Sequence, residues 1–171
     1  MVTATFTPID EYLAKTWHPD REYIDGEVCE RNLGEYAHAN LQSALVTWLR
    51  TRRRKWNIRV VVEQRVQVSA TRFRIPDVSV LSADGPVEQI IGRPPLICIE
   101  VLSKDDTLAG YRDRIADYTA MGVPNICLFD PERREVWTCT DDSMIKVTGE
   151  ILTATGTEIA IPLAEIWADL D

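Results

Sequence analysis

Residues 96–102 read LICIEVL, an apolar run that only Glu100 interrupts. Apolar runs of this length are typical of central strands that are buried on both faces of a sheet. A helical pattern follows over residues 107–121, and a second apolar run covers residues 125–129. A strand, a crossover helix and another buried strand form a βαβ unit, which predicts a right-handed connection between two parallel strands.

Two segments carry the apolar spacing of helices. In the later one, Gly122 stands where a helix C-terminal glycine belongs, and Pro124 follows just beyond it. In the earlier one, apolar residues recur from Ala37 onward along one helical face. The two faces comprise Leu108, Tyr111, Ile115 and Tyr118 in the later helix, and Leu41, Ala44, Leu45, Trp48 and Leu49 in the earlier one.

The rest of the chain alternates between short helices and strands. Thr7 is expected to cap a first helix that runs to about Thr16, and Asp25-Gly26 is a strong hairpin dipeptide. Pro76 predicts an exposed edge or a bulge in its strand. The other expected elements are a strand over residues 59–68 with Val60, Val62, Val66 and Val68 on one side, strands over residues 72–81 and 135–140, a further hairpin, and a terminal helix over residues 163–170. These elements predict one α/β domain over residues 1–171, with a mixed sheet flanked by helices.

Composition fits a single globular domain. The chain has 171 residues, of which 45% are apolar and 27% charged. No apolar run approaches the roughly 20 residues that span a bilayer, and the first residues lack the pattern of a secretory signal. None of the four cysteines has CxxC spacing, so buried reduced thiols are favoured over a zinc site and a cytoplasmic location is expected.

The net charge of −8 argues against a protein that coats nucleic acid nonspecifically, because neutralising phosphates requires a basic face. Charge can nevertheless be segregated along a chain. The one dense basic stretch comprises Arg50, Arg52, Arg53, Arg54 and Lys55. It either contacts phosphates or forms a solvated helix end, and the second arrangement is the more common one.

Glu100 is the most informative residue, because a carboxylate in a buried strand is costly unless it is paired, protonated or bound to metal. Pairing with Arg74 or Arg114 is the simpler interpretation. The position of Asp77 favours the alternative that Glu100 binds a metal ion, since the strand of Asp77 can place a second carboxylate beside Glu100. Two such carboxylates repel, and a divalent cation removes the repulsion. Oxygen ligands in an incomplete protein cage suit Mg²⁺ or Mn²⁺, with waters and substrate phosphate completing the shell.

The order and spacing of these motifs resemble the PD-(D/E)XK nuclease superfamily. Within it, they are most similar to a branch of bacterial restriction-endonuclease-like proteins of unknown function. The resemblance covers roughly residues 21–167. In chain order its motifs are EYIDGE (residues 22–27), His38, IPDVSV (residues 75–80), IEVLS (residues 99–103), Tyr118 with MGV (residues 121–123), and LFDP (residues 128–131).

The resemblance implies a restriction-endonuclease-like fold, with extra N- and C-terminal strands and hairpins, that cleaves DNA with the help of a metal. Asp77 and Glu100 would hold Mg²⁺ or Mn²⁺, together with the main-chain carbonyl of Val101. Leu102 occupies the position where the motif places lysine. In the similar branch this lysine lies on the following helix, one turn before the tyrosine, where this chain has Arg114.

Arginine retains its charge and can stabilise a phosphate transition state, but it cannot act as a base. Lys104 is a second candidate for the role of the lysine that the motif places at position 102. His38 faces the core side of its helix, so a satisfied boundary histidine is favoured over a catalytic one. Glu63 is either a third acidic ligand or a partner of neighbouring arginines. Tyr118 is expected to pack in the core with its hydroxyl near the site.

Three functions stay open at this point. The leading hypothesis is a Mg²⁺-dependent DNA endonuclease in which Arg114 replaces the usual lysine. The second is a catalytically impaired nuclease fold that acts as a binding or regulatory module. The third is a metal-dependent hydrolase with a substrate other than nucleic acid. Cutting both strands of DNA would favour a twofold homodimer, although no interface stands out in the sequence.

Overall fold

The computed structural model describes residues 6–31, 34–104 and 111–171. A six-stranded sheet of order β10-β9-β8-β7-β6-β3 forms its centre, and a four-stranded sheet of order β2-β1-β5-β4 lies beside it. In chain order the elements are α1 (Ile9–Ala14), β1 (Arg21–Ile24), β2 (Glu27–Glu30), α2 (Tyr36–Thr51), β3 (Ile58–Val62), β4 (Val66–Ser69), β5 (Arg72–Arg74), β6 (Val78–Ser82), β7 (Ile97–Val101), α3 (Arg112–Met121), β8 (Ile126–Asp130), β9 (Glu135–Cys139), β10 (Met144–Lys146), β11 (Ile151–Thr153), β12 (Ala160–Pro162) and α4 (Leu163–Ala168).

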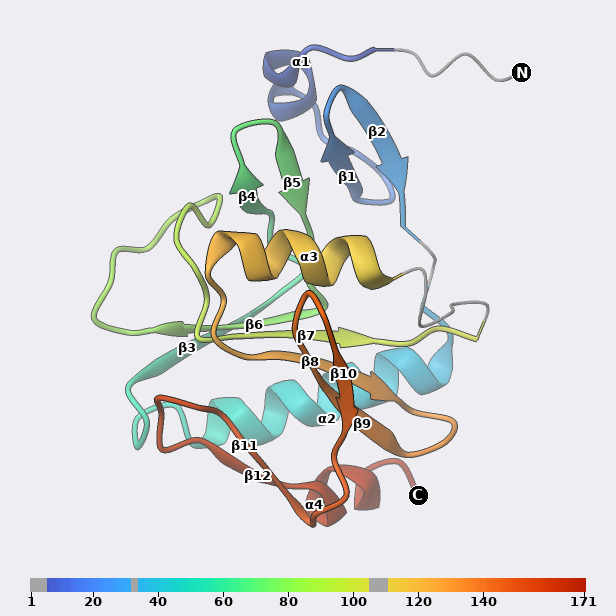
Figure 1. Ribbon diagram of the computed structural model, residues 1–171, viewed down its shortest axis with the longest axis vertical. Helices are drawn as coiled ribbons and strands as arrows, with labels where there is room; N and C mark the ends of the chain where they lie inside the picture. The colour runs from blue at the N-terminus through green and yellow to red at the C-terminus, as the bar shows by residue number, and fades with distance from the viewer. Residues whose placement is uncertain (1–5, 32–33, 105–110) are drawn as a thin grey trace.

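The central sheet is mixed. β7 and β8 are parallel neighbours, with Cys98 opposite Ile126, and the other pairs in this sheet are antiparallel. In Figure 1, α3 covers one face of the sheet, whereas α2 and α4 lie against the other face. The predicted parallel strands and the mixed sheet flanked by helices are therefore confirmed.

The alternation along β7 decides which face Glu100 occupies. Ile97, Ile99 and Val101 pack in the cluster that includes residues of α2 and α4. Cys98 and Leu102 pack in the cluster that includes residues of α3. Because successive side chains of a strand point to opposite faces, Glu100 lies on the α3 side of the sheet.

The smaller sheet packs against α1 through a separate aromatic cluster. Tyr12 of α1 is fully buried against Tyr23 of β1 and Phe73 of β5. The rings of Tyr12 and Tyr23 are stacked with centroids 4.9 Å apart. This cluster holds the hairpin of β1 and β2 next to the point where β5 leads into the central sheet.

The prediction of two long strands over residues 59–68 and 72–81 is wrong, because each segment forms two separate strands. β3 and β6 pair in the central sheet, whereas β4 and β5 pair in the smaller one. The first break lies at Glu63, whose φ is 49°. The second contains Pro76, which has no N–H to donate to a ladder. Val62 is also not on the buried side with Val60, since it is 46% exposed.

Most of the shorter elements agree with the sequence. The hairpin at Asp25-Gly26 is confirmed, with positive φ at both residues, and Gly122 ends α3 with a φ of 92°. Thr7 does not cap the first helix, because Pro8 occupies the N-cap position without a side-chain bond. Residues 107–110 of the expected helix, Leu108 included, lie outside the described residues.

The cysteine prediction also agrees with the described residues. Cys98, Cys127 and Cys139 are buried and Cys29 is partly buried, and all four are free thiols. Among the described helices, none combines the length and the apolar character that crossing a membrane requires.

Candidate functional site

Asp77 and Glu100 lie opposite each other at the edge where β6 begins. The register pairs Val78 with Ile99, and continuing it by one residue pairs Asp77 with Glu100. Both side chains are buried, with residue exposures of 3% and 1%. The predicted juxtaposition of the two carboxylates is therefore found in the structure, although Asp77 stands in the break before β6 rather than inside a strand.

The carboxylate of Asp77 is held by three donors from different parts of the chain. The N–H of Val101 donates to Oδ2 over 2.7 Å, so the side chain satisfies a backbone group at the end of β7. Nη2 of Arg31 donates to Oδ1 over 2.8 Å, and Nε2 of His38 lies 3.3 Å from Oδ2. Gln42 of α2 donates to the main-chain carbonyl of Asp77 over 2.9 Å. These contacts fix both the backbone and the side chain of a residue that belongs to no strand.

His38 lies at the boundary predicted for it, with 9% of the residue exposed. Burial alone would lower the pKa of His38. The hydrogen bond and the negative charge of Asp77 outweigh that effect, so the pKa is raised above its usual value. The imidazole of His38 and the guanidinium of Arg31 thus both contact the carboxylate of Asp77.

Glu100 is held less completely. The hydroxyl of Tyr118 donates to Oε1 over 2.5 Å. Nη1 of Arg114 lies 3.6 Å from Oε2, within ion-pair range but beyond a hydrogen bond, and Oε2 is buried without a hydrogen-bond partner among the described residues. Burial raises the pKa of Glu100 to about 8, while Arg114 lowers it and Asp77 raises it further. A buried carboxylate oxygen without a donor is a vacant position for a proton or a cation.

Arg114 and Tyr118 reach Glu100 from the same face of α3, because residues four apart on a helix are neighbours. Arg114 also lies 3.4 Å from Oε2 of Glu22 through its Nε. The guanidinium therefore spans two buried carboxylates, and they raise its pKa despite the burial. The predicted approach of Arg114 to the acidic pair is thus observed, and so is the position of the Tyr118 hydroxyl.

Glu22 begins a row of alternating charges that leads away from the site. Nη1 of Arg74 donates to Glu22 over 2.9 Å, and Nε of Arg74 donates to Asp117 over 2.6 Å. Asp117 in turn accepts a hydrogen bond from Arg72 over 2.7 Å, and Arg72 reaches Asp25 at the exposed hairpin turn over 2.8 Å. Arg74 is therefore engaged elsewhere, and the suggestion that it pairs with Glu100 is wrong.

The main-chain carbonyl of Val101 faces the same region. In a strand pair, the N–H and C=O of one residue point toward the same neighbour. Since the N–H of Val101 donates to Asp77, its carbonyl is directed to the Asp77 side of β7. It accepts a hydrogen bond from Tyr111 over 3.3 Å. Asp77, Glu100 and this carbonyl are the oxygen groups that the two strands present at this edge.

Two of the sequence candidates do not join the site. The Glu63 side chain is exposed, and within the described residues it forms no ion pair or hydrogen bond, so the idea of a third acidic ligand is not supported. Lys104 is exposed beyond β7 and lines a small hollow with Asp130 instead. Leu102 packs in the core cluster of α3, so Arg114 is the cation at Glu100.

Sequence reasoning missed Arg31, Gln42 and the burial of Glu22. Arg31 and Gln42 lie 46 and 35 residues from Asp77 in the chain, and local patterns carry no signal for such contacts. Glu22 was recognised only as part of the EYIDGE motif. Its burial follows from the position of β1 between β2 and β5.

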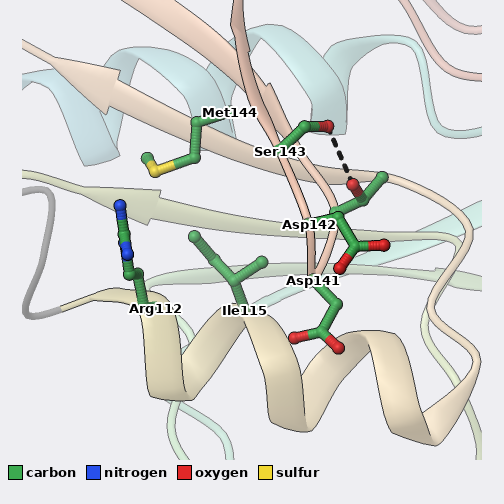
Figure 2. Close-up of a pocket in the computed structure, with 7 residues that line it drawn as sticks. Arg112, Ile115, Asp141, Asp142, Ser143 and Met144 are labelled. Atoms are coloured by element: carbon green, nitrogen blue, oxygen red, sulfur yellow. Dashed lines mark hydrogen bonds between the residues drawn. The ribbon is translucent and has the colours of Figure 1, made fainter.

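A broader pocket lies on another part of α3. It has a volume of about 380 Å³ between α3 and the hairpin of β9 and β10 (Figure 2). Arg112 and Ile115 line it from the helix, and Asp141, Asp142 and Met144 line it from the hairpin. Neither Asp77 nor Glu100 belongs to this pocket, and within the described residues no three His, Cys, Asp or Glu side chains gather closely enough to hold a metal. A metal at the carboxylate pair would therefore depend on main-chain and solvent oxygens as well.

Comparison with known proteins extends these observations. The model of the Uma2 family, described as "Putative restriction endonuclease", matches residues 10–164. The crystal structure of "a putative nuclease belonging to DUF820" from Anabaena variabilis is similar with a TM-score of 0.80, covering 96% of this chain and 100% of that chain at 21% identity. A cryoEM structure of a DrdV–DNA complex matches 64% of this chain and 9% of that chain, with a TM-score of 0.43 and 17% identity. Among curated proteins, no sequence matches the chain.

Proposed function

The chain belongs to the Uma2 family, and from that membership and the buried carboxylate pair we propose that it is a metal-dependent endonuclease that hydrolyses DNA phosphodiester bonds. The observation that carries the proposal is the pairing of Asp77 with Glu100 at one sheet edge, where Oε2 of Glu100 has no hydrogen-bond partner among the described residues. Structural stabilisation alone does not account for such an arrangement, because an unpartnered buried carboxylate oxygen weakens a fold.

The donor set suits a hard cation. Asp77, Glu100 and the carbonyl of Val101 offer oxygen only, and Mg²⁺ or Mn²⁺ accepts a few protein oxygens with water and substrate phosphate completing its shell. When bound, such an ion supplies Lewis acidity, which polarises a phosphodiester and lowers the pKa of an attached water. The vacant Oε2 supports this fit. Arg31 and His38 orient the carboxylate of Asp77, and a bound cation would compete with them for its oxygens.

The side chains of α3 have complementary roles in this proposal. Tyr118 donates to Glu100 and fixes the orientation of its carboxylate. Arg114 remains cationic and stabilises charge that develops on the phosphate, but it does not remove a proton from water. For cleavage of both strands we expect a twofold dimer, which would present two such sites.

Plasmid nicking in the presence of Mg²⁺ or Mn²⁺ tests the proposal. The wild-type protein should convert supercoiled plasmid to open circles, and Asp77→Ala should abolish the conversion. Asp142→Ala, which removes an exposed carboxylate elsewhere, is the matched control and should retain activity. Nicking that survives in Asp77→Ala would remove Asp77 from the chemistry and defeat the proposal.

One observation favours a second candidate, a nuclease fold that binds DNA but cleaves it poorly. Leu102 stands where the superfamily motif has lysine, and Arg114 is engaged by Glu22 and Glu100. Arg114→Lys distinguishes the two functions: a large gain in nicking indicates an impaired enzyme, whereas efficient cleavage by the wild type excludes the binding module. Absence of salt-sensitive duplex binding in Ca²⁺ would instead indicate a substrate other than nucleic acid.

A further inference from the structure

Positive charge is segregated at the C-terminal end of α2. Six of the 19 Lys and Arg residues lie in residues 50–59, and none of the 27 Asp and Glu residues lies there. The whole chain carries a net charge of −8. This segment is therefore a local basic surface on an acidic protein, and its charge distribution favours a polyanionic ligand.

Most of this charge is not neutralised. In this segment, which the structure describes completely, only Arg52 pairs with a carboxylate, that of Glu165, over 3.2 Å. The other five cations have no acidic partner within the described residues, and we refer to them as the arginine patch: Arg50, Arg53, Arg54, Lys55 and Arg59. By contrast, most arginines elsewhere in the described residues pair with acids, as Arg93 does with Glu88.

The end of a helix explains only part of the arginine patch. Cations near a helix C-terminus are favoured by the helix dipole, and Nη1 of Arg53 donates to the carbonyl of Arg50 over 3.2 Å. That effect falls off within the last turn, and α2 ends at Thr51. Arg54 and Lys55 lie beyond the helix, and Arg59 belongs to β3. Their charge needs another explanation.

The arginine patch surrounds a groove rather than a flat surface. The groove has a volume of about 380 Å³, and the cations Arg50, Arg53, Arg54 and Arg59 line it together with Asn57. The guanidinium of Arg59 donates to carbonyls of residues 82–85, which fixes it at one wall. Cations from a helix end, a turn and a strand suit a row of phosphates, as on a nucleic-acid backbone, better than a single small anion.

The patch and the carboxylate pair are joined by two elements. Along α2, twelve residues separate Arg50 from His38, which contacts Asp77, and this corresponds to about 18 Å at 1.5 Å per residue. Along β3, the chain runs from the patch to Glu63, whose N–H donates to the carbonyl of Asp77 over 3.4 Å. β3 is the outermost strand of the central sheet, so no described strand covers its outer edge (Figure 1).

We propose that the arginine patch is a second DNA-binding surface, which holds the phosphate backbone of a duplex whose scissile bond lies at Asp77 and Glu100. This inference rests on the proposed nuclease function and assigns its substrate a length requirement. A separation of about 18 Å corresponds to about five base pairs of duplex, so a duplex of about ten base pairs or more engages both surfaces. Shorter duplexes engage only one.

The test measures binding of a fluorescent duplex of about 20 base pairs in Ca²⁺ by anisotropy, over a series of salt concentrations. The variant is the triple substitution Arg50→Gln, Arg53→Gln and Arg54→Gln, which changes exposed side chains only. We expect its affinity to fall about tenfold or more and its salt dependence to weaken by about one unit of slope for each lost contact. With a duplex of about six base pairs, which engages one surface at a time, the variant should lose less affinity than with the long duplex.

A matched control removes the same charge elsewhere. The triple substitution Arg133→Gln, Arg134→Gln and Lys146→Gln affects cations that already pair with acids, and it should bind the long duplex as the wild type does. Hydrolysis of bis(p-nitrophenyl) phosphate with Mn²⁺ should be equal in all three proteins, because this small diester reaches only the carboxylate pair. If the patch variant fails to unfold cooperatively, the single substitution Arg54→Glu is measured instead, with the same expectations.

The outcomes separate this inference from the proposed function. Unchanged duplex affinity and salt slope in the patch variant would overturn the inference, even where the wild type cleaves DNA. Loss of binding in the patch variant without any cleavage by the wild type would support the patch and refute the nuclease. An equal loss of binding for single-stranded RNA and duplex DNA would overturn the assignment of a duplex.

Discussion

Replacing Glu100 with glutamine should change the stability of the metal-free protein in a direction that depends on pH. Glu100 is 1% exposed, and its pKa is about 8 in the folded protein against 4.5 for an ordinary glutamate. The folded state therefore binds a proton that the unfolded chain releases between these values. The stabilisation from protonated Glu100 is fully present below pH 4.5 and is lost as the pH rises through about 8.

The size of the effect follows from the two pKa values. Each pKa unit corresponds to about 1.4 kcal/mol, so ionisation of Glu100 destabilises the fold by up to about 5 kcal/mol above pH 8. The substituted glutamine would keep the acceptor for Tyr118 but would place an unpaired amide beside Arg114, which costs about 1–3 kcal/mol. Glu100→Gln should therefore be about 2–4 kcal/mol more stable than the wild type at pH 9, which corresponds to about 4–16 °C in Tm. At pH 5 only the cost of the amide remains, and the variant should be the less stable protein.

Differential scanning calorimetry in EDTA from pH 5 to pH 9 measures this change of sign. Glu158→Gln removes an exposed carboxylate that forms no ion pair with any described residue, and it corrects for the lower net charge of the variant. Its difference from the wild type should stay small and nearly constant with pH. A Tm difference for Glu100→Gln that is equally independent of pH would refute the raised pKa and the reasoning built on it.

Three further perturbations probe the site and its supports. Arg74→Met leaves Glu22 and Asp117 buried without their shared partner and should lower the free energy of unfolding by about 3–5 kcal/mol in urea titrations; a loss below about 1 kcal/mol would contradict this. Tyr118→Phe removes the donor to Oε1 of Glu100 and should cost about 1–3 kcal/mol at pH 9, measured the same way, whereas a neutral effect would mean that this hydrogen bond contributes little. Under the proposed function Mn²⁺ should raise the Tm of the wild type but not that of Asp77→Asn, and a rise retained in the variant would place the ion elsewhere.

The sequence was sufficient to predict the centre of the fold and the acidic pair. The run around Glu100 and the helix after it have periodicities that depend only on local geometry, and the structure has the parallel strands that they predict. The order of the motifs carried the resemblance to restriction-endonuclease-like proteins, which the family match confirms. Opposition of Asp77 and Glu100 required only that two neighbouring strands pair in the right register.

The breaks between the two sheets could not be predicted in the same way. Valines occupy every second position from Val60 to Val68 except at Gln64, so the pattern predicts one strand although the chain changes sheets after Val62. That change depends on which strands pair, a property of the whole fold. The ion-pair partners of the buried carboxylates are equally hard to predict, because Glu22 and Arg74 lie 52 residues apart in the chain. A single sequence contains no local signal for such contacts.

The row of charges from Asp25 to Glu100 has an odd number of members. Four carboxylates alternate with three guanidinium groups, and a carboxylate stands at each end. At the hairpin end, water surrounds the surplus negative charge, since Asp25 is half exposed. At the other end, Glu100 is buried, so water does not solvate its charge. The odd number of groups therefore leaves the charge of Glu100 without a cation of its own, and under the proposed function a proton and a metal ion would compete for its buried Oε2.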